Sequence, residues 1–142
     1  MDIATVETAV INRLKARITG LAVEPFPGDT KSYRLLHPRG AVLAHYAGSI
    51  FSRPERRPAE VQQEEMRFEL TLVMRNLRTK DAGAYAAIAS VKRALLGHRV
   101  AGCGRIFLNG ISLVDSEDGF WWYVLGISML SAAVVRNTGD GQ

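Results

Sequence analysis

The residues best suited to chemistry are dispersed along the sequence. His37, His45 and His98 lack the spacing of metal ligands, and His45 lies inside an apolar run, which favours a structural histidine. Cys103 has no cationic neighbour except Arg105 and no identifiable base, so a buried, inert thiol is favoured over a nucleophile. Because a single cysteine forms neither an internal disulfide nor a cysteine-based metal site, the fold must depend on packing.

Two short motifs share features with ligand-binding sequences. The glycines on either side of Cys103 form a G-x-G, but they lead into an expected strand and not a helix, which indicates neither a dinucleotide fingerprint nor a P-loop. Asp115, Glu117 and Asp118 gather carboxylates in an expected turn without the spacing of an EF-hand, so we expect a solvated turn. The sequence therefore predicts no catalytic residue, cofactor or metal, and we expect a protein that is not an enzyme.

The positive charge of the chain is concentrated in one region. Residues 31–57 hold six lysines and arginines against one glutamate, a net charge of +5, whereas the whole chain carries +4. Such a region favours phosphates or an acidic protein surface as partners, although a solvated loop explains it equally well. It lacks interleaved aromatic residues, so at most nonspecific phosphate contacts are expected. Within it, Arg53, Arg56 and Arg57 are the candidate partner-facing or DNA-facing residues.

Length and composition bound the class of protein. A chain of 142 residues fits one domain, and its hydrophobic fraction of 47% and charged fraction of 23% exclude collagen-like, low-complexity and wholly disordered chains. The apolar runs fall short of the ~20 residues that span a bilayer, and no secretory pattern is seen at the N-terminus. We therefore expect a folded protein that begins in the cytoplasm without membrane contact.

Two segments have the apolar spacing of amphipathic helices. Residues 3–18 place apolar side chains at steps of three and four, with Asp2 as the expected N-cap and Gly20 as the stop. Residues 81–96 repeat this pattern before Gly97. Alanines at positions 82, 86, 87, 89 and 94 of this second helix permit the close approach of a sheet or a second subunit, although alanine is also the best helix former.

Alternating or continuous apolar runs predict the strands. Residues 66–75 give the clearest signal, because apolar side chains alternate along ten residues and predict one core face and one face that is wet or contacts a partner. The apolar run 41–46 between two glycines predicts a central strand buried on both faces. The acidic residues 115–119 are expected to join a closing hairpin. The remaining expected strands are 21–25, 105–114 and 120–129.

The closing strand is apolar on both faces at its start. Successive side chains alternate across a sheet, so Trp121 and Trp122 should point to opposite sides, with Phe120 on the side of Trp122. One face must be core, and the other requires either a covering helix or a neighbouring protein. Phe120, Trp121 and Trp122 are therefore the candidate subunit interface.

The segment from Ser49 to Glu64 has the composition of a loop. It contains Pro54 and Pro58, both signs of charge and no useful apolar period, so we expect a long mobile loop inside the domain. Residues 136–142 are expected to form a flexible tail after a single domain over residues 1–135.

Three stretches together resemble the small tail proteins of Mu-like prophages: GAVLAHYAGSIF at 40–51, MRNLR at 74–78 and GAYAAIASVKRALLG at 83–97. The resemblance covers about residues 3–130 and implies the fold of phage tail-terminator, or tail-completion, proteins. That fold is a single α+β domain with a mixed, mostly antiparallel sheet flanked by two main helices. It implies a structural protein that assembles, as a ring of about six subunits, on the tail tube.

The resemblance also implies partners and a location. A terminator ring stops polymerisation of the tail tube protein and presents a surface to the head-completion protein, with nonspecific DNA contact expected in the lumen. The protein would act in the bacterial host cytoplasm during assembly and remain in the virion tail. The alternative is a monomeric or dimeric α+β binding module that contacts nucleic acid or an acidic protein through residues 31–57.

Overall fold

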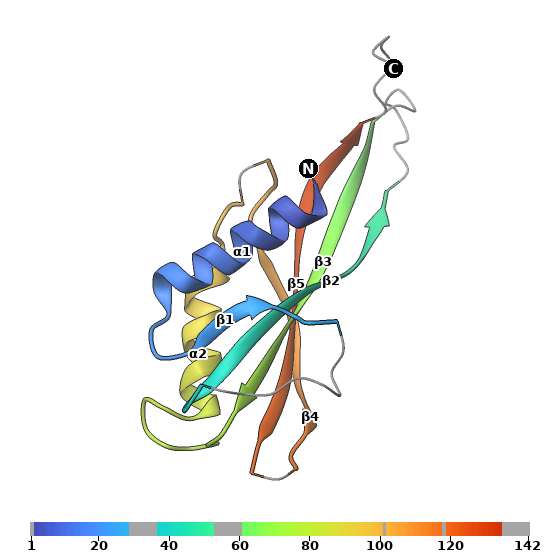
Figure 1. The fold of residues 1–142 in the computed structure, drawn as a ribbon. Helices are drawn as coiled ribbons and strands as arrows, with labels where there is room; N and C mark the ends of the chain where they lie inside the picture. Colours follow the sequence, from blue (N-terminus) through green and yellow to red (C-terminus); the bar gives the residue numbers. More distant parts are fainter. Residues whose placement is uncertain (1, 29–36, 53–60, 101, 118, 135–142) are drawn as a thin grey trace.

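The computed structural model describes residues 2–28, 37–52, 61–100, 102–117 and 119–134 (Figure 1). They form one mixed five-stranded sheet and two helices, which confirms the predicted α+β class. In chain order the elements are α1 (Ile3–Arg17), β1 (Ala22–Pro25), β2 (Gly40–Phe51), β3 (Val61–Met74), α2 (Ala84–Leu95), β4 (Phe107–Asp115) and β5 (Trp121–Val134).

The sheet has the strand order β1-β2-β3-β5-β4. Only β1 and β2 pair in parallel, and the other neighbours are antiparallel. β3 and β5 pair along their whole length, from Val61 opposite Val134 to Met74 opposite Trp121. β4 and β5 form the predicted hairpin, and β1 and β4 are the two edges. The strand predicted at 41–46 as a central strand is β2. It lies inside the sheet, next to the middle strand β3.

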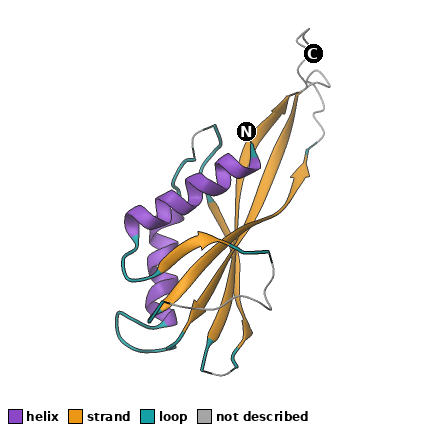
Figure 2. Cartoon of the chain, in the orientation of Figure 1, coloured by secondary structure: helices purple, strands orange, loops and turns teal. Residues whose placement is uncertain are grey.

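Both helices lie on the same face of the sheet (Figure 2). The predicted core face of β3 is confirmed, because its even-numbered side chains from position 66 to 74 are buried on this helix side: Met66, Phe68, Leu70, Leu72 and Met74. The other face was expected to be wet or to contact a partner, yet Thr71 and Val73 on that face are buried within the chain. They pack against apolar side chains of α1 and α2, including Val10, Leu14 and Val91. Each fully buried side chain of this size stabilises the fold by about 1.5–3 kcal/mol relative to an exposed one.

A smaller cluster lies on the opposite face of the sheet. Ala41, Leu43 and Val73 form it, with half-buried Phe26 and Trp122 packed against them. Val42 and Ala44, the alternate residues of β2, belong to the main core, so the prediction that this strand is buried on both faces is confirmed for 41–44. The described helices do not cover this face, and the cluster is closed by aromatic side chains instead.

The predicted loop from Ser49 to Glu64 is wrong at both ends. β2 continues to Phe51, which pairs with Glu64, and β3 begins at Val61. β5 likewise continues beyond Met129 to Val134. The reason is that β3 lies between two neighbours and satisfies its backbone on both sides, so its polar start needs no apolar period. Mobility was predicted for all of 49–64, and its central part, residues 53–60, lies outside the described residues, as does the predicted tail 136–142.

Candidate functional site

The predicted arginine site lies outside the described residues. Arg53, Arg56 and Arg57 fall in the segment 53–60 between β2 and β3, so their role stays a prediction. The strands that precede and follow this segment in sequence extend beyond the helices together with the end of β5 (Figure 1).

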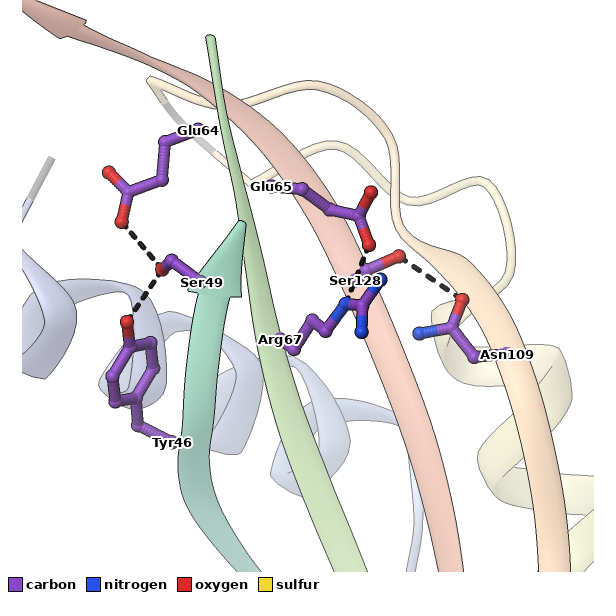
Figure 3. A network of polar contacts seen from close by, with 7 residues as sticks. All are labelled: Tyr46, Ser49, Glu64, Glu65, Arg67, Asn109 and Ser128. Carbon is purple, nitrogen blue, oxygen red and sulfur yellow. Dashed lines mark hydrogen bonds and ion pairs between the residues drawn. The ribbon is translucent and has the colours of Figure 1, made fainter. Parts of the chain in front are cut away.

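Polar side chains tie this strand extension together (Figure 3). The hydroxyls of Tyr46 and Ser49 lie 2.6 Å apart, and Ser49 donates to Glu64 Oε2 at 2.6 Å. In β3 itself, Arg67 Nε lies 2.7 Å from Glu65 Oε2. Of these contacts, the one between Ser49 and Glu64 links β2 to β3 through side chains.

The predicted aromatic interface is divided between two faces. Trp121 packs against the main core, whereas Phe120 and Trp122 pack against the smaller cluster, so the predicted alternation is confirmed. All three side chains are half-buried within the chain. Arg75 stacks on Phe120 with its guanidinium 5.1 Å from the ring centroid. Contact of these residues with a second subunit stays a prediction, and no single patch contains all three.

Exposed apolar side chains are concentrated on β4, although the ends of β2 and β5 and the two helices also carry some. Four of its apolar side chains are strongly exposed: Phe107 (56%), Ile111 (39%), Leu113 (48%) and Val114 (56%). Ile111 and Leu113 are opposite Leu125 and Tyr123 and so lie on the helix side, yet α1 and α2 pack mainly against β1, β2 and β3. We call these four residues the β4 edge. Sequence reasoning placed the strand but missed its position at the edge of the sheet.

An unpaired edge with apolar side chains is a hazard that natural proteins usually blunt with charge, proline or bulges. The opposite edge follows this rule, because β1 is four residues long and ends at Pro25. β4 has register shifts between Leu108 and Gly110 and between Leu113 and Asp115, yet it keeps exposed apolar residues. Phe107, opposite Ser128, faces the other side of the sheet from Ile111 and Leu113, so these residues form an exposed strand edge rather than one patch. An unpaired edge of this kind is a candidate contact surface for another chain.

Three arginines that are far apart in sequence meet beside the helix ends. Arg17, Arg39 and Arg93 line one cavity of about 420 Å³. Arg17 is the last residue of α1, Arg93 lies in the last turn of α2, and Arg39 precedes β2. The partial negative charge at helix C-termini favours cations at two of these positions. We call the three residues the arginine pocket, and its wall is completed by Ile18, Thr19, Asp81, Ala86, Ala89 and Ser90.

The pocket is held by contacts to the backbone. Arg39 Nη2 donates to the carbonyl oxygen of Asp81 at 2.6 Å, and Arg13 Nε donates to the carbonyl oxygen of Ala94 at 2.8 Å, which joins α1 to α2. The Arg39 guanidinium lies against the backbone of Gly20, which has a φ of +82°. A Cβ at this position would collide with the guanidinium.

The positive charge of the pocket is poorly compensated. The two ion pairs among the described residues, His45 with Glu69 and Arg67 with Glu65, include none of its arginines. Arg39 Nε is buried without a hydrogen-bond partner in the described structure. Arginine forks bind carboxylates and phosphates in two-point contacts, so the pocket is suited to an oxyanion. The sequence offers no signal for it, since only the packing of the two helix ends brings the residues together.

Outside this pocket, the cysteine and two of the histidines lie in surroundings that can be described individually. Burial raises the pKa of the Cys103 thiol, which agrees with the expected inert thiol. Partial burial, and then the nearby charges of Arg13 and Arg17, lower the pKa of His98. His45 Nε2 lies 3.3 Å from Glu69 Oε1, although its Nδ1 has no hydrogen-bond partner among the described residues. In the part of the chain that is described, no three His, Cys, Asp or Glu side chains are grouped to hold a metal ion.

Comparison with known proteins places the chain in a family. Among curated proteins none matches it in sequence. A chain from a solved structure titled "Virion of native gene transfer agent (GTA) particle" shares the fold, with a TM-score of 0.64 and 16% identity over 90% of this chain and 96% of that one. No described helix is long and apolar enough to cross a membrane. Residues 10–141, nearly the whole sequence, match the Gp37 protein family, and the chain therefore belongs to that family.

Proposed function

We propose that the chain is a structural protein of a phage-type virion, and that it acts as the tail terminator, a ring that caps the tail tube and presents the surface for head joining. Its partners would be the tail tube protein, the head-completion protein and further copies of itself. It would assemble in the bacterial host cytoplasm and stay in the virion tail.

The comparisons support the virion assignment. The matching solved chain is part of a gene transfer agent particle and has a similar length and fold. The fold also agrees with the α+β architecture that the resemblance to tail terminators implies.

The observation that carries the proposal is the β4 edge. The chain already has a main core built from both helices and the sheet, so these exposed apolar side chains are surplus to its own packing. A protein that forms a ring needs such a surface, because each subunit must bury area against its neighbours.

Deletion of the gene from an inducible prophage that carries it tests the proposal. We expect overlong tails or tails without heads in electron micrographs, and full rescue by the wild-type gene in trans. Tails of normal length joined to heads in the deletion strain would overturn the proposal. A purified chain that binds duplex DNA as a monomer and is absent from the virion would instead favour a DNA-binding module.

A further inference from the structure

A positively charged surface and a negatively charged surface lie near opposite edges of the sheet. The arginine pocket adjoins β1 and β2, since Arg17, Ile18 and Thr19 precede β1 and Arg39 precedes β2. Exposed Asp115, the last residue of β4, and exposed Glu117 lie where the chain turns from β4 toward β5. With the order β1-β2-β3-β5-β4, the pocket and this turn are separated by the width of the sheet. We call residues 115–117 the acidic turn.

The arginine pocket and the acidic turn carry opposite charges. The pocket has three guanidiniums, and among the described residues that line it Asp81 is the only one with a carboxylate. The acidic turn has two carboxylate side chains, and neither forms an ion pair with a described residue. Ala86 and Ala89 leave space in the pocket wall, which fits the expectation that the small residues of the second helix permit close approach of a partner.

We propose that the acidic turn of one copy docks in the arginine pocket of the next copy, with the β4 edge buried alongside. Asp115 and Glu117 would accept hydrogen bonds from the Arg17, Arg39 and Arg93 guanidiniums. The contact joins two different surfaces, so it repeats from copy to copy and closes as a ring when the rotation allows. The inference rests on the proposed terminator function and names the surfaces by which the subunits of that ring meet.

Cysteine cross-linking in assembled tails tests this contact. Ser90 lies in the pocket and Ser116 in the acidic turn, so the double variant Ser90→Cys with Ser116→Cys should form disulfide-linked ladders beyond the dimer under mild oxidation. The matched control pairs Ser116→Cys with Thr5→Cys. Thr5 is exposed on the same helix as Arg17 but lies about 18 Å along its axis. We expect at least tenfold less ladder from the control, and none from wild type because Cys103 is buried.

Charge reversal gives a second and independent test. Arg17→Glu with Arg93→Glu makes both surfaces acidic, and Asp115→Arg with Glu117→Arg makes both basic. Neither variant alone should support normal tails. Co-expressed, they should restore tail length, because each turn then meets a pocket of opposite charge in an alternating ring. Circular dichroism and urea unfolding of each purified variant establish that both fold.

The outcomes separate the inference from the function on which it rests. If the double-cysteine chain rescues tail length and is present in tails but gives no more ladder than the control, the docking is wrong while the terminator function stands. If the two reversed variants fold but fail when mixed, the docking is also wrong. If Arg17→Glu with Arg93→Glu weakens binding to duplex DNA and leaves the cross-linking of the cysteine pair intact, the pocket is a phosphate site and the inference is overturned.

Discussion

The middle of the sheet and its β4 edge differ in how far their apolar side chains are buried. In β3 the alternate side chains on the helix side are fully buried, whereas β4 leaves four apolar side chains exposed. Both strands have apolar residues, so hydrophobicity alone does not distinguish them. Their places in the strand order do, because the helices pack over β1, β2 and β3 and leave β4 open. Stability therefore resides in the middle of the molecule, and the exposed β4 edge is the surface that we propose for assembly.

The largest effect is expected from truncation in the middle. Phe68→Ala removes a fully buried ring from the centre of the core and should lower the free energy of unfolding by about 3–5 kcal/mol. Urea unfolding followed by tryptophan fluorescence measures this loss. If Phe68→Ala lowered the free energy of unfolding by less than Leu113→Ala, a truncation at an exposed site, the proposed difference between core and edge would be wrong.

A smaller loss of stability is expected from a substitution at Gly20, the glycine against which the Arg39 side chain packs. Gly20→Ala places a methyl group against the Arg39 guanidinium at a positive φ and should cost more than ~1 kcal/mol of stability. Gly28→Ala is the matched control, because Gly28 also has a positive φ, +86°, but a Cβ there meets nothing within 4 Å. Equal costs for the two variants in thermal or urea unfolding would show that Arg39 does not constrain Gly20.

Substitutions at the edge should separate stability from assembly. Leu113→Ser with Val114→Ser replaces exposed apolar side chains, so the free energy of unfolding should change by only ~0.5 kcal/mol or less per site. Tail length in the complemented deletion strain should nevertheless become abnormal. Normal tails from this variant would show that β4 is not an assembly surface.

The smallest effect concerns acid stability. The pKa of His98 is lower in the folded chain than its unfolded value near 6.5, so the unfolded state takes up a proton first as the pH falls. The stabilisation by neutral His98 is therefore complete above pH ~6.5 and is lost as the pH falls through the folded pKa. His98→Gln should lose less stability than wild type between pH 8 and 5 in urea titrations. Identical losses would rule out this linkage.

The sequence predicted those features that depend on local periodicity. Alternation identified β3, helical spacing identified α1 and α2, and the acidic turn identified the closing hairpin. The polar ends of β2 and β3 were missed, because hydrogen bonds to neighbouring strands and not apolar side chains stabilise them. The arginine pocket was missed for a related reason. Its residues come from two helix ends and a strand start, and only tertiary packing places them together.

The number and position of copies in the virion test the terminator ring most directly. Quantitative mass spectrometry of purified tails, with immunogold labelling of the chain, measures both. A ring predicts about six copies per tail, all at the end that joins the head. Labelling distributed along the tube, or a copy number that rises with tail length, would contradict the terminator ring.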